Sequence, residues 1–136
     1  MAIWIQISPG SNEPIYTQLT RQISEAIAKG RLSVGDKLPP VRKLAAELVI
    51  NPNTVAHAYT VLEHAGLVNT KTGSGTFISN PKLRTTHAAD INLLTQRMDT
   101  FITRALNLGI DAPDLIAMFK HRLEGFVNKS ENEKKI

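Results

Sequence analysis

The residues best suited to chemistry are amides, hydroxyls, cations and glycines between positions 42 and 75. They are Arg42, Lys43, Asn51, Asn53, Thr54, Lys71, Thr72, Gly73 and Gly75, and Pro52 and His57 lie among them. Amides and hydroxyls exchange hydrogen bonds, and arginine and lysine bind phosphate or the acceptor-rich edge of a base. Glycines let another molecule approach the backbone closely. These residue types predict binding of a polar, anionic partner.

Sets of residues suited to catalysis or metal binding are missing from the sequence. The chain has no cysteine, which excludes a thiol nucleophile, a thiolate metal site and a disulfide framework. Its four histidines include no HxxxH pair. No nucleophile–base set or phosphate-cradling loop accompanies the acids. We therefore expect neither an enzyme nor a bound cofactor or metal.

Length and composition indicate one domain, or a small domain with an appendage. The chain has 136 residues, of which 42% are hydrophobic. No apolar stretch approaches the roughly 18 residues of a membrane span. The first ten residues lack the basic start and long apolar run of a secretory signal. We expect a cytoplasmic protein that does not contact a membrane.

The excess positive charge belongs to the N-terminal part. Residues 1–84 hold nine Lys and Arg against five Asp and Glu, whereas residues 85–136 hold seven of each sign. The net charge of +4 therefore lies entirely in the first part. This asymmetry favours a polyanion partner for that part, although such an excess is also common in soluble domains.

The elements that position the polar residues follow from periodicity and caps. Alternating isoleucines in residues 3–7 predict an extended start. One amphipathic helix runs from Pro14, as its first residue, to Gly30, and a second begins near Pro40. Asn51 is a typical N-cap before Pro52, so a third helix begins there.

The third helix ends at Gly66, and two short strands follow. Residues 67–72 and 76–78 predict a hairpin joined at residues 73–75. Only about three residues separate the second and third helices, which is the spacing of a helix-turn-helix. Residues 1–80 are therefore expected to form a winged helix-turn-helix domain.

This arrangement suits double-stranded DNA. The second helix of a helix-turn-helix enters the major groove, where its first residues meet base edges. Cations on the preceding helix and on the hairpin would bind phosphate groups of the DNA. The first N–H groups of the second helix, the recognition helix, would attract a further phosphate. The same residues also have structural interpretations, with Asn51 as a cap and Gly73 and Gly75 as turn formers.

The C-terminal part has a different period. After a polar linker at residues 81–90, apolar residues recur at steps of three and four, and a second apolar helix follows Gly109 and an Asp111 cap with Asp114 at its third position. The predicted dimerisation seam is Ile91, Leu94, Met98, Phe101, Ala105, Leu108, Leu115, Phe119 and Leu123. Residues 91–128 would form this two-helix arm, and residues 129–136 a frayed tail.

Two short helices cannot bury both apolar faces alone, so we expect a homodimer. Packing of the stripe against the winged helix of the same chain is the alternative.

Six linked motifs across roughly residues 12–79 resemble the GntR family of bacterial regulators. They are PIYTQL at 14–19, GRLSVGDKLP at 30–39, RKLA at 42–45, NPNTVAHAY at 51–59, LEHAGLV at 62–68 and GSGTF at 73–77. The short two-helix tail is similar to the YtrA-like subfamily. The resemblance implies DNA contacts at Arg42, Asn51, Asn53, Thr54, His57, Thr72 and Gly73. It also implies repression of a neighbouring operon, often one encoding a transporter.

The sequence departs from the family pattern at three places. Pro52 and Ala56 stand where some relatives have arginines that touch DNA, so those contacts are absent here. Val49 occupies a turn position that glycine often takes. Because valine is strained at positive φ, we expect a slightly different turn.

The predicted fold is mainly α (α+β), with an N-terminal winged helix-turn-helix and a C-terminal dimerisation arm. The predicted function is sequence-specific transcriptional regulation by a homodimeric repressor of a near-palindromic operator. The alternative is a winged-helix module for protein contact or for non-specific nucleic-acid binding. The sequence does not indicate whether a small-molecule effector binds or what it would be. The arm is too small to enclose a pocket of a few hundred Å³, so an effector would bind between protomers or between arm and wing.

Overall fold

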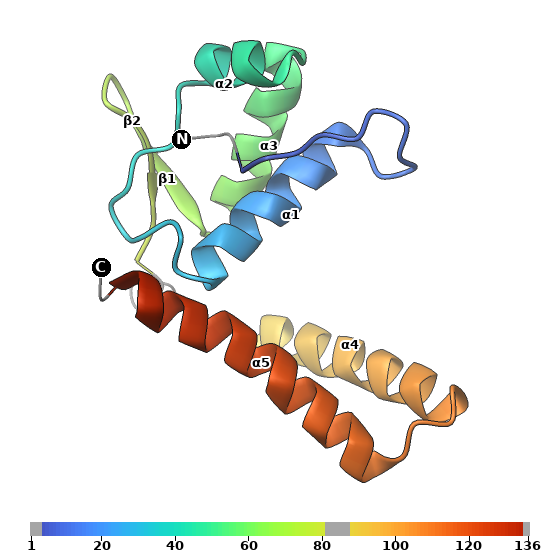
Figure 1. Ribbon diagram of the computed structural model, residues 1–136. Coiled ribbons are helices and arrows are strands. Elements are labelled where there is room, and N and C mark those ends of the chain that lie inside the picture. Colours follow the sequence, from blue (N-terminus) through green and yellow to red (C-terminus); the bar gives the residue numbers. More distant parts are fainter. Residues whose placement is uncertain (1–3, 81–87, 135–136) are drawn as a thin grey trace.

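The computed structural model describes residues 4–80 and 88–134, with the backbone alone at 88 and 128–134. Its elements are α1 (Ile15–Ala28), α2 (Val41–Leu48), α3 (Pro52–His64), β1 (Val68–Lys71), β2 (Gly75–Ile78), α4 (Ala88–Asn107) and α5 (Ala112–Lys134). Figure 1 shows two parts, a winged helix made by α1 to β2 and a helical hairpin made by α4 and α5. This order of elements confirms the predicted fold class.

From residue 4 onward, the part that the structure describes, the extended start forms no strand but pairs with α1 through glutamine side chains. The Gln22 side chain accepts a hydrogen bond from Gln6 N (2.9 Å) and donates one to Gln6 O (2.7 Å). Gln18, which is buried, binds Ser8 N and O in the same manner at 2.8 and 3.0 Å. These bonds satisfy the backbone without a sheet and bring Ile5 into the core.

Helix α1 begins one residue later than predicted, since Pro14 is its N-cap (φ −55°, ψ 148°). Its apolar stripe buries Leu19 and Ile23. Gly30 follows the helix at φ 80°, as expected of a glycine that ends a helix in the left-handed region.

The turn between α2 and α3 differs from the prediction. Val49 takes the left-handed conformation (φ 56°, ψ 52°), so the expected departure from the family's turn is wrong. Three residues must reverse the chain here, and Ile50 N closes the turn on Ala45 O at 3.0 Å. The Val49 side chain is 88% exposed, so its methyl groups clash with no packed neighbour, and the strain is confined to the backbone.

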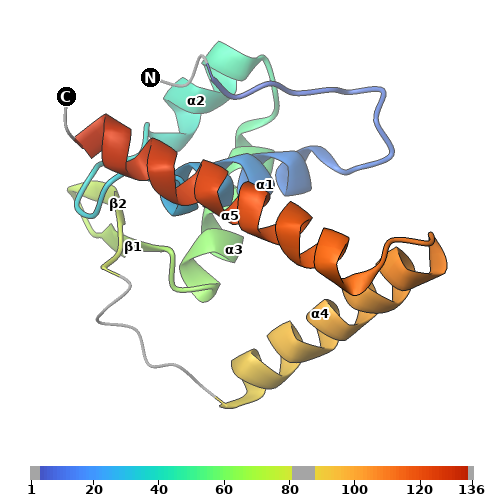
Figure 2. The same cartoon turned by 60° about the horizontal axis from the view of Figure 1, so that its bottom comes forward.

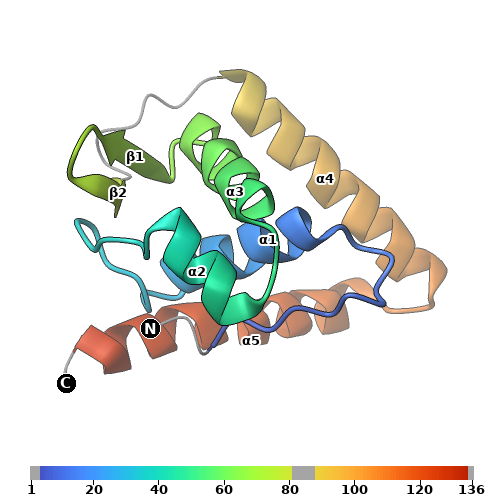
Figure 3. The same ribbon diagram turned by 90° about the horizontal axis from the view of Figure 1, so that it is seen from above.

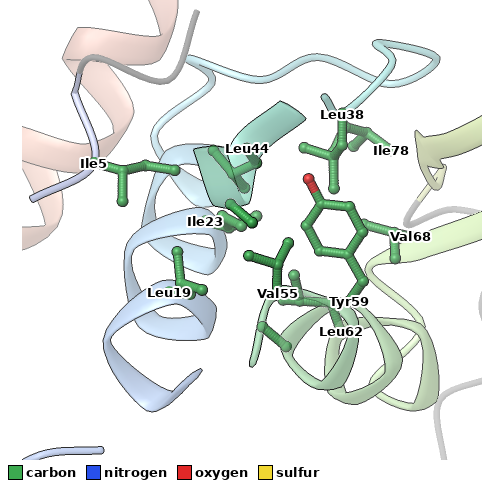
Figure 4. Packing of buried hydrophobic residues seen from close by; sticks show 12 residues of the cluster. Ile5, Leu19, Ile23, Leu38, Leu44, Val55, Tyr59, Leu62, Val68 and Ile78 are labelled. Carbon is green, nitrogen blue, oxygen red and sulfur yellow. The ribbon is translucent and has the colours of Figure 1, made fainter. Parts of the chain in front are cut away.

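One hydrophobic core joins every element of the winged helix. Figure 4 shows side chains from α1, α2, α3, the 31–39 loop and both strands converging on it. Tyr59 lies among them and donates a hydrogen bond to Pro39 O at 2.7 Å. Burial raises the pKa of the Tyr59 phenol, because the interior disfavours its charged form. This bond ties the recognition helix to the segment that precedes α2.

The wing is a hairpin with a third segment beside it. Strands β1 and β2 pair antiparallel from Val68↔Ile78 to Lys71↔Gly75, so the tip is residues 72–74 rather than 73–75. Residues 35–38 run along the other edge of β2, where Leu38 N donates to Thr76 O (2.8 Å) and Ile78 N to Asp36 O (2.9 Å). The hairpin is therefore fixed along both edges of β2.

The arm agrees with the predicted turn but not with the predicted ends. Gly109 has φ 87°, and Asp111 Oδ1 accepts a hydrogen bond from Asp114 N (3.0 Å), which confirms the cap. Helix α4 already begins at Ala88, inside the predicted linker, whose residues 81–87 lie outside the described part. Helix α5 runs to Lys134, so it extends into the predicted tail of residues 129–136, and fraying of that end stays a prediction. The stretch 129–134 has no glycine or proline and is rich in lysine and glutamate, which favour a helix.

Helix α5 returns toward the winged helix, whereas α4 diverges from it. Figures 1 and 2 show α5 crossing α1, with the C-terminal half of α5 near the C-terminal end of α1, and Figure 3 shows α4 at a distance from the wing. Lys29 Nζ, just after α1, lies 4.8 Å from the centre of the Phe126 ring. No helix in the described ranges is long and apolar enough to cross a membrane.

Candidate nucleic-acid interface

The outer face of α3 carries the predicted base-reading residues. Asn53, Ala56, His57 and Thr60 are exposed, and Thr54 is half-exposed. Spacings of three and four residues place them on one side of the helix, opposite the buried Val55, Ala58, Tyr59 and Leu62. The structure therefore presents a polar, small-residue face of the kind that fits a major groove.

The first turn of α3 does not offer the anion site that we predicted. Pro52 has no N–H, and Asn53 N donates to the Asn51 side chain at 2.8 Å. Thr54 N donates to Asn51 O at 3.0 Å. These groups are already partnered, so Asn51 acts as the helix cap and the helix start has little capacity left for phosphate.

Two cations lie at the start of α2. Arg42 and Lys43 are both exposed. No carboxylate among the described residues lies within 4.0 Å of either charged group. The ion pair that the described residues do form joins Arg21 of α1 to Glu13 at 3.1 Å. The two charges at α2 are therefore free to meet an external anion.

His57 has a protein contact that the sequence did not reveal. Its ring meets the Tyr16 ring edge-on, with centroids 4.4 Å apart and planes at 62°. In the sequence, Tyr16 fits the apolar period of α1, and nothing there indicates a contact with His57. The contact places the first turn of α1 at the border of the α3 face, so Tyr16 belongs to the same surface as His57.

The wing presents its predicted residues at the tip. Lys71, Thr72 and Gly73 are exposed, and Gly73 has φ 80°. Lys71 Nζ lies 5.2 Å from the centre of the Phe77 ring, a cation–π contact that orients the ammonium. In Figure 1 the hairpin tip and α2 lie at the same, upper side of the winged helix, and the arm lies below.

Lys37 is a further cation beside the wing, and it is missing from the predicted site. It forms an antiparallel bridge with Phe77 of β2. A Cβ atom built on Gly75 would lie 2.6 Å from Lys37 Cε. No sequence signal within the 30–39 loop indicates this placement, because the loop is far from the hairpin along the chain.

The seam of the arm is exposed along most of its length. Leu94, Met98, Phe101, Phe119 and Leu123 are each between 46% and 58% exposed. Ala105 and Leu115, near the turn, are already buried within the protomer. An open groove of about 350 Å³ runs between the two helices, and Ile102 and Ile116 line it together with seam residues. Neither isoleucine was among the predicted seam residues.

No three His, Asp or Glu side chains in the described part gather as a metal site would require.

The winged helix is similar to that of known bacterial regulators. The family described as bacterial regulatory proteins, gntR family, matches residues 15–78. The HTH-type transcriptional repressor YtrA of Bacillus subtilis is 39% identical over 111 residues, which are 82% of this chain and 85% of that protein.

Two solved structures extend the likeness to the arm. A transcriptional antiterminator from Listeria monocytogenes superposes with a TM-score of 0.79 at 28% identity, over 90% of this chain and 91% of that one. YtrA from Sulfolobus acidocaldarius has a TM-score of 0.55 at 31% identity, over 88% and 97%. The chain therefore belongs to the GntR family of bacterial regulatory proteins and is a DNA-binding transcriptional regulator.

Proposed function

We propose that this protein is a homodimeric repressor that reads a near-palindromic operator, with one winged helix on each half-site. The observation that carries the proposal is the exposed apolar face of the arm. In Figure 1 the arm lies on the opposite side of the winged helix from the hairpin tip and α2. A dimer held at that face leaves both DNA-reading faces free. Repression is inferred from the name of the Bacillus subtilis relative, a transcriptional repressor.

The distribution of apolar side chains supports a partner for the arm. Among the described residues, thirteen of the fifteen exposed large hydrophobic side chains belong to the arm, twelve of them in α4 or α5 and Leu108 in the turn between these helices. Those that line the groove between the two helices form an exposed apolar patch, and such a patch marks an interaction site. The winged helix of the same chain leaves the seam exposed, which argues against the intramolecular alternative.

A second copy of the chain fits this face by charge. Residues 85–136 hold seven cations and seven anions, so two arms approach each other without net repulsion. Two amphipathic helical hairpins that pack face to face form a four-helix bundle, and each supplies the apolar surface that the other lacks. A two-fold dimer of this kind matches the symmetry of a palindromic site.

DNA reading is assigned to α3, α2 and the wing. Asn53 and Thr54 would meet base edges, and the small Ala56 would let the helix approach a thymine methyl. Arg42 would bind phosphate or guanine, and the wing would contact the flanking backbone.

The decisive experiment is selection of binding sites from a random pool of duplex DNA. We expect enrichment of an inverted repeat with half-sites about ten base pairs apart. Binding of the whole pool at low salt without any enriched motif would contradict the proposal. That result would favour the second candidate, a winged helix for non-specific nucleic-acid or protein contact.

Arg42→Ala tests the reading face directly. We expect operator affinity to fall by at least about tenfold, as for loss of a charge-assisted contact, with the fold and the dimer intact by circular dichroism and light scattering. Arg21→Ala is the matched control, because it removes the same charge from α1, where Arg21 pairs with Glu13. Equal affinity of the Arg42 variant and wild type would remove Arg42 from the interface.

A further inference from the structure

We propose that Lys37 and Lys71 bind one DNA backbone phosphate together, on a single face of the wing. Gly75 provides the space that lets Lys37 reach this position. The inference rests on the DNA-binding function and adds a residue from outside the helix-turn-helix and the hairpin.

Backbone pairing holds Lys37 beside the wing. The segment 35–38 follows the free edge of β2 through hydrogen bonds from Leu38 N to Thr76 O (2.8 Å) and from Gly35 N to Ile78 O (2.9 Å). Lys37 stands opposite Phe77 in this pairing. Directly paired residues project to the same face, so Lys37 and Phe77 share one side of the three-stranded unit.

Lys71 reaches the same face from the other edge of β2. It pairs with Gly75, and Gly75 and Phe77 are alternate residues that point to one side. The ammonium of Lys71 lies 5.2 Å from the centre of the Phe77 ring, in agreement with that placement. Both lysines therefore flank the same aromatic ring.

Gly75 explains how the two cations come together. At φ 127° its backbone is in a region that favours glycine, and a Cβ atom there would lie 2.6 Å from Lys37 Cε and 3.4 Å from Lys37 Nζ. The end of the Lys37 side chain thus occupies the place of the missing Gly75 side chain. That place is directly across from Lys71, at the spacing of a cross-strand pair, about 5 Å.

No acid of the described neighbouring segments compensates the two charges. Asp36 Oδ2 accepts a hydrogen bond from Ser33 N at 2.8 Å, away from the wing face. Glu63 accepts one from Thr70, whose side chain projects to the opposite face of the hairpin from that of Lys71. Two like charges held opposite each other are unfavourable without an anion. A phosphate between them removes the repulsion and accepts hydrogen bonds from both.

The test uses the full-length protein and the dependence of its DNA affinity on salt. For B-DNA the slope of log K against log[salt] changes by about 0.9 for each phosphate contact. We expect Lys37→Gln and Lys71→Gln each to weaken binding several-fold on every duplex sequence. The double variant should lose little more than either single variant and reduce the slope by about 0.9, because one phosphate is shared.

Three results would overturn the proposal. One is an unchanged affinity in Lys37→Gln, and another is a slope reduced by about 1.8 in the double variant, which indicates two separate phosphates. The third is a change of sequence preference, which indicates base contact. Arg21→Gln is the charge-matched control, and its slope of log K against log[salt] should equal that of wild type.

Gly75→Ala is a second probe of the same contact. It should displace Lys37 and reproduce the Lys37→Gln phenotype, with no further loss in the Lys37→Gln background. Additive losses would contradict the role of Gly75. Because phosphate contacts do not depend on sequence, the variants can be compared on random duplex. Failure of the operator proposal, seen as absence of an enriched motif, therefore stays distinguishable from failure of this one.

Discussion

The winged helix and the arm distribute their apolar residues in opposite ways. Within the described part of residues 4–80, only Val34 and Val49 are large hydrophobic side chains that count as exposed. In the arm the relation is reversed, and only Ala105 and Leu115 are buried among the hydrophobic side chains described there. The first region completes its core within one chain, whereas the second leaves its apolar face uncovered, which supports the proposed dimer.

This contrast separates two sources of stability. The winged helix buries side chains from three helices and a hairpin of the same chain, so we expect it to be stable without a partner. Helices α4 and α5 bury little within the protomer, whereas most helical stability in proteins comes from tertiary packing of an amphipathic face. We therefore expect arm stability to depend on protein concentration and winged-helix stability not to.

The largest effect is expected from charges in the seam. Replacing both Leu94 and Phe101 with glutamate places four carboxylates in the dimer interface, two from each protomer. If each costs about 2 kcal/mol, the dimer dissociation constant should rise roughly a millionfold. Light scattering should show monomers, which bind operator poorly.

Leu93→Glu is the matched control for the seam, because Leu93 is 50% exposed but two residues from Ile91 and so on another side of the helix. A dimer that survives in the double variant but not in Leu93→Glu would move the interface to that other side.

A truncation in the core of the winged helix should have the next largest effect. Leu62 is 1% exposed, and Leu62→Ala should lower the free energy of unfolding by about 2–5 kcal/mol. Urea denaturation followed by circular dichroism measures this value. Leu123→Ala, in the half-exposed seam, should weaken the dimer and leave the winged-helix transition unchanged. If both variants lowered the free energy of unfolding of the winged helix by a similar amount at high protein dilution, the two regions would not be independently stable.

Val49 should show an effect of opposite sign. Its left-handed backbone costs roughly 1–2 kcal/mol, and the extra flexibility of glycine in the unfolded chain offsets about half of this. Val49→Gly should therefore raise the melting temperature by a few degrees. The equally simple change Val34→Gly should not, because Val34 is exposed but is not at positive φ. A lower melting temperature in Val49→Gly would contradict strain at this turn.

The smallest effect is expected where the two regions meet. The contact between Lys29 and the Phe126 ring is partly exposed, and such cation–π pairs contribute about 0.5–1 kcal/mol. A double-mutant cycle with Lys29→Met and Phe126→Leu should give a coupling energy of this size. Zero coupling would show that α5 does not rest on α1 in solution.

Local signals predicted much of the molecule from sequence. The Asn51 cap before Pro52, the glycines that end α1, α3 and α4, and the Asp111 cap each depend on a few adjacent residues. The apolar periods then determined which face of each helix is buried. For this reason the order of elements, the exposed polar side of α3 and the apolar face of the arm could all be predicted.

The tertiary structure decided what depends on residues far apart in the chain. Lys37 reaches the wing only because the 35–38 segment pairs with β2, and Tyr16 meets His57 only because α1 packs on α3. Val49 accepts a left-handed backbone because a three-residue reversal requires it and its side chain is free in solvent. Local propensity assigns caps, periods and charges, whereas close approach of distant segments is set by the packing of the whole core, which no single stretch of sequence contains.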